Sequence, residues 1–330
     1  MLSAVATLGF AVAVAAGYFG HVHRALDAFS HLRVYFAALM ALSALPLFAT
    51  NLLKAGALAV FLALLAIATT SGNVPVPAIG MRYGPLYPYD AEQPVYRLLQ
   101  TNLRYDNQEP GLFLSLVGRT RPDVITLNEV SDVWVEKLRL LESAYPYRIV
   151  CPHLEEVWGV AILSRRPFAA AEAPRCDPRG AFASSVFSFG GRWVTIATMH
   201  LGWPWPFEQA WQVGGLKPYL QSIREPAILA GDMNAVPWSY TVASVAKAGA
   251  FTLMPSPGPT WLSFRLPHFL FFAGLPIDQV FEKGGVRIHA IRTLEPVGSD
   301  HLPVLVEFSV EPRRTPPDNE LSKLAQAALR

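Results

Sequence analysis

Three long stretches without a charged side chain, all near the N-terminus, most constrain what this chain can fold into. Residues 2–20, 34–53 and 55–72 contain no Asp, Glu, Lys or Arg, and each approaches the ~20 apolar residues that a helix needs to cross a membrane. The 330-residue chain is 52% hydrophobic and only 16% charged, unlike ordinary soluble domains. These features predict three transmembrane helices within residues 1–72, in a multi-pass protein of the cell membrane. A cleaved signal peptide is an alternative for residues 2–20, although no Lys or Arg precedes the apolar run.

The side of the membrane on which the rest of the chain lies is only weakly indicated. With three helices, Arg24 and Arg33 share a side with the C-terminal part of the chain, and Lys54 lies on the other. Positive residues are enriched on the cytoplasmic side, so this small excess favours a cytoplasmic domain. Cys151 and Cys176 are the only cysteines. Both a disulfide in an oxidising compartment and two buried thiols fit such a pair.

Segments rich in Pro and Gly mark the limits of the remaining domain. Residues 73–94 read NVPVPAIGMRYGPLYPYDAEQP, a composition that cannot sustain a helix and predicts a stiff linker. Residues 311–330 begin with EPRRTPPDNE and are expected to form a polar tail, with at most a short helix at residues 321–329. The folded domain is therefore expected to span residues 95–310.

Within that domain, short β-rich runs that each end in polar residues alternate with helical patterns. Strands are predicted at residues 95–101, 124–127, 159–163, 193–198, 227–230, 279–281 and 302–308, and helices at residues 111–119, 133–145 and 207–223. This order predicts a mixed α/β fold.

Eight polar side chains sit at or just beyond the ends of these strands: Asn102, Glu129, His200, Asp232, Asn234, Asp278, Asp300 and His301. Each alone has an ordinary explanation as a turn residue, a helix cap or a core histidine. Together they are expected to converge on one rim of a sheet, where loops can hold a ligand. Carboxylate and amide oxygens suit Mg²⁺ or Mn²⁺. Histidines beside them add proton transfer, so the set indicates metal-assisted phosphate hydrolysis.

Seven ordered motifs resemble those of the endonuclease/exonuclease/phosphatase superfamily. They read LLQTNL, with Asn102; PDVITLNEV, with Glu129; GVAILSRRP; TMHL, with His200; LAGDMNA, with Asp232 and Asn234; PIDQVF, with Asp278; and SDHLPVLVEF, with Asp300 and His301. Each motif alone is weak, but the ordered set is specific and covers residues 95–308. The resemblance implies a four-layered α/β sandwich, in which two mixed sheets pack face to face with helices outside. The family often has an Asn in the strand-edge motif where this chain reads WGVA at residues 158–161, so one phosphate or metal contact could be missing.

The resemblance also implies roles for the acidic and amide residues. Asp232 would orient or deprotonate the attacking water, while Asn234 holds a phosphate oxygen. Glu129 would be the principal ligand of the metal, with Asn102 beside it. Asp300 would be a second carboxylate on the metal side.

The resemblance implies roles for the two histidines as well. His301, paired with Asp278, would stabilise the charge that develops on phosphorus. His200 matches the second histidine of phosphodiesterase members and would approach the leaving-group oxygen as a general acid.

The substrate is indicated by what surrounds these motifs. A nuclease needs a basic surface, whereas this chain has a net charge of only +2 and six lysines. Aromatic residues flank the motifs of His200 and Asp278: Trp203, Trp205, Phe207, Trp261, Phe264, Phe269, Phe271 and Phe272. Clusters of this kind favour a membrane interface, although filling the core of the sandwich is an equal alternative.

We therefore expect a membrane-anchored, Mg²⁺-dependent phosphoesterase that acts on a phosphorylated small molecule or membrane lipid, with a lipid-linked phosphate or pyrophosphate the leading substrate. Membrane-anchored bacterial members of the superfamily have a similar layout, and some are linked to cell-envelope lipid carriers. That resemblance favours an extracytoplasmic domain, against the charge count. A nuclease acting on DNA or RNA and a catalytically silent membrane receptor or scaffold are the alternatives.

Overall fold

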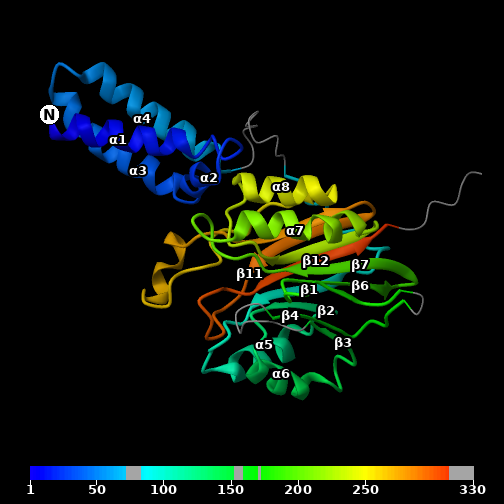
Figure 1. Cartoon of the computed structure of the whole chain (residues 1–330). Helices are drawn as coiled ribbons and strands as arrows, with labels where there is room; N and C mark the ends of the chain where they lie inside the picture. Colours follow the sequence, from blue (N-terminus) through cyan, green and yellow to red (C-terminus); the bar gives the residue numbers. More distant parts are fainter. Residues whose placement is uncertain (72–82, 152–158, 170–171, 312–330) are drawn as a thin grey trace, which may run out of the picture.

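The computed structural model describes residues 1–71, 83–151, 159–169 and 172–311 (Figure 1). Its larger part consists of two mixed six-stranded sheets that pack face to face. The first sheet has the order β11-β12-β1-β2-β4-β3. Its strands are β1 (Tyr96–Asn102), β2 (Val124–Asn128), β3 (Tyr147–Val150), β4 (Val160–Ser164), β11 (Val286–Thr293) and β12 (Val304–Val310).

The second sheet has the order β5-β6-β7-β8-β10-β9. Its strands are β5 (Arg175–Cys176), β6 (Phe182–Phe189), β7 (Arg192–Met199), β8 (Ala227–Asp232), β9 (Thr252–Leu253) and β10 (Asp278–Lys283). In both sheets one central pair is parallel, β1 with β2 and β7 with β8, while the other ladders are antiparallel. The seven strands predicted from the sequence are all confirmed to within two residues at each end.

Helices cover the outer face of each sheet, which completes the four layers (Figure 1). Helices α5 (Pro110–Thr120) and α6 (Asp132–Leu138), with the 3-10 turn η2 (Arg139–Leu141), lie on the first sheet. Helices α7 (Gln209–Ser222) and α8 (Tyr240–Gly249) lie on the second. The three predicted helices are confirmed, although the one predicted at residues 133–145 ends earlier, in η2. Helix α8 was not predicted.

Successive side chains along a strand point to opposite faces of the sheet, which explains why each sheet packs on both faces. Side chains of β1 such as Leu98 point into the layer between the sheets, while Leu99 points to α5 and α6. The middle layer is wholly apolar at its centre, with Phe187, Ile196 and Val306 each fully buried. Burial of apolar area on both faces of each sheet is the main force that stabilises such a sandwich.

The N-terminal residues form a helical bundle made of α1 (Leu2–Ala16), α2 (Arg24–His31), α3 (Arg33–Ala44) with the 3-10 turn η1 (Leu45–Ala49), and α4 (Leu53–Ala68). The prediction of three transmembrane helices is not confirmed. Among the described residues, no single helix combines the length and the apolar character that crossing a membrane requires. The helices Arg24–His31 and Arg33–Ala49 meet both requirements only when they are taken as a pair, which is bent by 68°.

The physical reason is that the first two uncharged stretches contain a break, while α4, in the third, has only 16 residues. Helix α1 ends before Gly17, and at 1.5 Å per residue its 15 residues extend about 22 Å, less than a ~30 Å hydrocarbon core. Pro46 starts the tighter turn that ends α3. The segment between the first two uncharged stretches forms the short helix α2.

Part of the predicted linker packs on the sandwich. The amides of Gly84 and Tyr87 donate to the carbonyl oxygens of Leu253 and Ile288, each at 2.8 Å. Residues 73–82, residues 312–330 and the helix predicted at residues 321–329 lie outside the described residues, and the domain boundaries stay a prediction. Cys151 and Cys176, left open by the sequence, form a disulfide with their Cα atoms 5.5 Å apart.

Candidate active site

The predicted site residues converge where the central strands of the two sheets end. Asn102 is the last residue of β1 and pairs with Asn128, which directly precedes Glu129. Asp232 is the last residue of β8, and Asp278 is the first residue of the antiparallel β10, directly opposite it. The C-terminal end of β8 and the N-terminal end of the antiparallel β10 lie at the same edge of their sheet. The side chains at these strand ends therefore meet between the two sheets.

Asn102 joins the two central carboxylates. Its Nδ2 donates to Oε1 of Glu129 and to Oδ2 of Asp232, both at 2.9 Å. Its Oδ1 accepts from the backbone N–H of Arg104 at 2.9 Å, which fixes the orientation of the amide. Oε2 of Glu129 accepts from the backbone N–H of Tyr105 at 3.0 Å. Asn102 therefore holds the two carboxylates close together, and a direct contact of Asn102 with metal stays a prediction.

The two histidines face the same carboxylate. Nδ1 of His301 lies 2.8 Å from Oδ2 of Asp278, and its Nε2 lies 3.6 Å from Oδ2 of Asp232. Nε2 of His200 lies 3.6 Å from the same Asp232 oxygen and 3.9 Å from Oε1 of Glu129. The two histidines and the two aspartates are almost wholly buried, Asp232 completely so. The arrangement places Asp232 at the centre, with one of its oxygens 3.6 Å from Nε2 of both histidines.

Burial and mutual charge shift the acidities of this group. Burial, aided by the charge of Asp278, raises the pKa of Asp232 to about 7 although His301 opposes the change. Burial alone would lower the pKa of His301, but the charges of Asp278 and Asp232 outweigh it and raise that pKa to about 10. The pKa of Asp278 is lowered because its contacts with His301 outweigh its burial. Burial raises the pKa of Glu129.

Two groups of these residues have the composition and spacing of a metal site. Glu129, His200 and Asp232 form one, and Asp232, Asp278 and His301 form the other; within each, one ligand atom per residue lies within 4.8 Å of the others. A divalent cation between such atoms would relieve the cost of burying carboxylates together. The donor set of this edge of the sheets therefore fits a divalent metal, with Asp232 common to both groups.

Asp300 lies beside the centre but in neither group. Its Oδ2 accepts from the indole N–H of Trp261 at 3.0 Å. Its charge nevertheless contributes to raising the pKa of His301 and of Glu129. A role of Asp300 as a second metal-side carboxylate stays a prediction. Trp158, in the departure from the family pattern, lies outside the described residues.

Asn234 is placed by the turn that follows β8. Its backbone N–H donates to Oδ1 of Asp232 at 2.7 Å, and its Nδ2 donates to the carbonyl of Leu201 at 2.8 Å. Asn234 and Glu129 have φ of +43° and +55°, conformations that are uncommon outside glycine and that cluster at functional sites. Gly231 allows the close approach of β7, since a Cβ there would lie 2.2 Å from the carbonyl oxygen of Met199.

A buried network ties this turn to the N-terminal helices. The side-chain amide of Gln209 donates to the carbonyl of Asn234 at 3.0 Å, and its Oε1 lies 3.0 Å from the hydroxyl of Thr241. That hydroxyl lies 2.9 Å from Oδ2 of Asp27, in α2. The Asp27 carboxylate also accepts the backbone N–H groups of Tyr240 and Thr241, at the start of α8. One acid of the helical bundle thus supports the segment that shapes the catalytic turn.

Sequence reasoning missed the buried amides and hydroxyls that orient the acids. Nε2 of Gln100 donates to Oδ1 of Asp278 at 2.8 Å, and Oδ1 of Asn128 accepts the backbone N–H of Asp232 at 2.9 Å. The hydroxyl of Thr260 accepts the backbone N–H of Asp278 at 3.2 Å. Gln100 and Asn128 lie inside two of the recognised motifs, and a polar residue in an otherwise apolar strand was the signal that could have found them.

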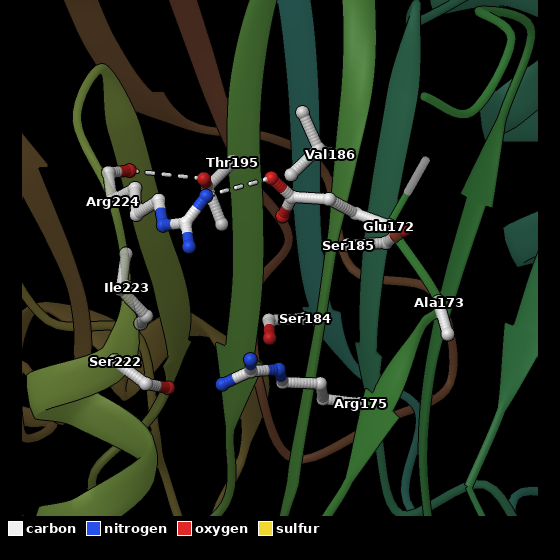
Figure 2. Close-up of a pocket in the computed structure, with 10 residues that line it drawn as sticks. All are labelled: Glu172, Ala173, Arg175, Ser184, Ser185, Val186, Thr195, Ser222, Ile223 and Arg224. Carbon is white, nitrogen blue, oxygen red and sulfur yellow. Dashed lines mark hydrogen bonds and ion pairs between the residues drawn. The ribbon is translucent and has the colours of Figure 1, made fainter. Parts of the chain in front are cut away.

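A second hollow, at the opposite end of β7 and β8, is too small to compete as a substrate site. Figure 2 shows its polar lining, with the ion pair between Arg224 and Glu172 at 3.3 Å and the hydrogen bond from Thr195 to the carbonyl of Arg224. Its volume of about 30 Å³ holds one or two waters. This hollow is therefore no candidate for a substrate site.

Buried carboxylates and histidines at one edge of a two-sheet sandwich are the equipment of metal-assisted phosphate-ester hydrolysis. The model of the Endonuclease/Exonuclease/phosphatase family matches residues 95–301, more than half of the chain, and the chain belongs to this family. It is therefore a phosphoesterase, a hydrolase with a candidate buried metal site. No curated protein matches the chain.

Solved structures share the fold. A humanized TDP2 from D. rerio is 19% identical, with a TM-score of 0.52 over 66% of this chain and 99% of that one. The catalytic domain of human Nocturnin is 20% identical, with a TM-score of 0.51 over 66% of this chain and 94% of that one. A Bacteroides vulgatus endonuclease/exonuclease/phosphatase is 17% identical, with a TM-score of 0.55 over 66% of this chain and 100% of that one. At these identities the likeness shows the fold alone.

Proposed function

We propose that this protein is a membrane-anchored, Mg²⁺-dependent phosphoesterase that hydrolyses a lipid-linked phosphate or pyrophosphate outside the cytoplasm. The observation that carries the chemistry is the position of Asp232. It lies close to both His301 and His200, and the Asn102 amide joins it to Glu129. A buried carboxylate with a pKa of about 7 is suited to accept a proton at neutral pH.

In the proposed mechanism, each side chain has a separate task. Asp232 takes the proton of the attacking water. The Asp278 carboxylate fixes the Nδ1–H form of His301 and keeps the ring protonated, so that Nε2–H can donate to the phosphoryl oxygens as charge develops on them. His200 protonates the leaving oxygen. Glu129 would hold the metal beside Asp232, and the metal would supply positive charge against the phosphoryl oxygens.

The N-terminal bundle supports membrane anchoring because its small side chains lie inside and its large apolar side chains lie outside, the opposite of a helical bundle in water. Its interior consists largely of small side chains, such as Ala37, Ala63 and Ala66, which are nearly inaccessible. Large apolar side chains such as Leu42 and Phe61 are exposed. Small residues inside and large apolar residues outside are typical of helices that associate in lipid, and an exposed apolar surface of this kind needs a partner.

The aromatic residues that flank the site support a lipid substrate. Phe269 and Phe272, in the 3-10 turn η3 (His268–Ala273), are 75% and 77% exposed, so they do not fill the core. Trp203 is also exposed, and its ring lies 5.4 Å from that of Trp261, whose indole contacts Asp300. Exposed Trp and Phe beside the catalytic centre suit the interface of a bilayer.

The disulfide supports the proposed side of the membrane. Cys151 and Cys176 are bonded, and such bonds persist in oxidising compartments and are rare in the cytosol. This observation favours an extracytoplasmic catalytic domain over the arrangement suggested by Arg24, Arg33 and Lys54.

The proposal is tested with the full chain reconstituted in phosphatidylcholine vesicles. Phospholipids, a polyprenyl pyrophosphate, sphingomyelin and DNA are assayed with Mg²⁺, with and without a chelator, beside the Asp232→Asn variant. Turnover of a lipid phosphate that needs both Mg²⁺ and Asp232 supports the proposal. Cleavage of DNA alone, weakening steeply with salt, identifies a nuclease instead, and absence of turnover on every substrate indicates a catalytically silent protein.

A further inference from the structure

A large apolar cavity lies where the N-terminal helices meet the catalytic domain. Its volume of about 520 Å³ is within the ~300–1,000 Å³ typical of sites for small molecules. The apolar side chains that line it include Val34, Tyr35, Ala38, Trp238, Phe272 and Leu275. No residue of the candidate catalytic centre lines it, so it is a separate space.

Hydrogen bonds on two sides hold the walls of the cavity together. The indole N–H of Trp238 donates to the carbonyl of Ser30 at 2.8 Å. The hydroxyl of Tyr35 donates to the carbonyl of Ala273 and lies 3.3 Å from that of Gly274. Helices α2 and α3 therefore form one wall, and loops of the catalytic domain form the other. Figure 1 shows the bundle meeting the domain beside α8.

Segments of the catalytic wall are joined to residues of the active site by short stretches of chain and by hydrogen bonds. Leu275 and Pro276 line the cavity, and the chain reaches Asp278 two residues later. Three residues of extended chain span at most about 11 Å, so Leu275 and Asp278 are close. Pro259, also in the wall, precedes Thr260, whose hydroxyl accepts the backbone N–H of Asp278. The backbone of Leu275 pairs in both directions with Trp261.

We infer that this cavity binds the hydrocarbon chain of the amphipathic phosphate ester that the enzyme hydrolyses. The inference rests on the proposed function and adds the site that holds the chain. The occupant follows from the two walls: one belongs to a helical bundle with an apolar exterior, along which a chain can leave a bilayer, and the other carries the segments that support Asp278. A lipid bound here has its phosphate beside the catalytic centre and its chain against α2 and α3.

Photolabelling tests where the chain lies. Hexadecyl phosphate that carries a diazirine at the far end of its chain is irradiated with the full protein in phosphatidylcholine vesicles, and labelled residues are identified by mass spectrometry. Labelling of Ala38 or Phe272, suppressed by unlabelled hexadecyl phosphate, is expected. Labelling confined to outward-facing side chains of the bundle, such as Leu8 or Phe61, would overturn the inference.

A matched pair of variants tests the same site by affinity. Ala38 and Ala57 are both exposed alanines of the bundle, but only Ala38 lines the cavity. Ala57 lies far from the cavity. Thr70, which lines the cavity just beyond the end of α4, follows Ala57 by 13 residues, or about 20 Å of helix. Each methylene group buried changes affinity about fourfold, so a ring that displaces two of them should weaken binding about 15-fold. Ala38→Trp should weaken binding of hexadecyl phosphate by this factor and leave butyl phosphate unchanged.

Ala57→Trp should bind both alkyl phosphates as the unmodified protein does. Equal behaviour of the two variants, or equal loss for both chain lengths, would overturn the inference. Because labelling and binding need no turnover, the outcomes are separable from those of the proposed function. Labelling in the cavity without hydrolysis of any lipid would support the binding site and contradict the proposed lipid phosphoesterase activity. Hydrolysis of a lipid with labelling elsewhere would support that activity and contradict the binding site.

Discussion

Replacing Asp278 by Asn should lower the pKa of His301 and slow hydrolysis by at least ~10²-fold, the usual scale for losing a positioned acid–base group. The two side chains are buried, and Nδ1 of His301 lies 2.8 Å from the carboxylate. At an effective dielectric constant of ~20, attraction across that distance is about 6 kcal/mol. Its loss suffices to bring the pKa of His301 from about 10 into the neutral range.

The stability of the fold should respond in a defined pH window. The pKa of His301 is raised above its ordinary value of 6.5, so its protonated form stabilises the fold fully below that value, and this contribution disappears as the pH rises through about 10. In Asp278→Asn the folded pKa is lower, and the same loss should occur at a lower pH. Conversely, the lowered pKa of Asp278 contributes stability above pH ~3.8 that is lost as the pH falls further.

The assay is an NMR titration of ¹³C-labelled histidines in the metal-free protein, with thermal unfolding across the same pH range and kcat measured with Mg²⁺. Asp123→Asn is the control, because Asp123 is also a largely buried carboxylate in an ion pair, with Arg166, but lies away from the site. It should cost stability without moving the His301 titration. An unchanged His301 pKa in Asp278→Asn, or a loss of rate of only a few fold, would refute the assigned pairing.

Three further predictions address other parts of the protein. Glu129→Gln should fold normally but lose most of its activity, since the amide has the shape of the carboxylate without its charge for Mg²⁺; unchanged turnover at saturating Mg²⁺ would contradict this. Asp27→Asn removes charge from a buried acid that accepts four hydrogen bonds, so it should lower the melting temperature and reduce kcat together, checked by calorimetry and kinetics. Replacing Phe271 and Phe272 by Ser should reduce hydrolysis of lipid in vesicles while sparing a short-chain soluble analogue, and equal losses on both with a lower melting temperature would show that these rings are packing residues.

The sheets were predictable because their strands carry strong local signals. Runs such as VITL and AILAGD are apolar, short and bounded by polar residues, and both form central strands. Edge and outer strands were missed, as in β11, where Arg287, His289 and Arg292 interrupt the apolar pattern. Helix α8 was missed because its sequence, YTVASVAKAG, contains three β-branched residues, a Ser and a Gly, which offset the helical preference of its three alanines.

The site was predictable as a set of residues but not as a geometry. The ordered motifs pointed to Asp232, His301 and their neighbours, and the structure brings these together. Which atom contacts which depends on the pairing of β8 with β10 and on the packing of the two sheets, and no local pattern encodes that. Asn102 illustrates the point: the family resemblance placed it beside Glu129, and only the structure shows that its amide joins Glu129 to Asp232.

The position of the N-terminal bundle is the feature furthest from what the sequence could indicate. From hydropathy alone, residues 1–72 are predicted to form membrane helices that do not contact the catalytic domain. Asp27 is then only a charged residue in the loop between two of these helices. Yet Asp27 is buried, accepts both backbone N–H groups at the start of α8 and reaches the catalytic turn through Thr241 and Gln209. A buried carboxylate is costly unless it is satisfied in this way, so the contact is specific. The bundle therefore helps to shape the catalytic turn, and the cavity between the two parts exists only while both are docked.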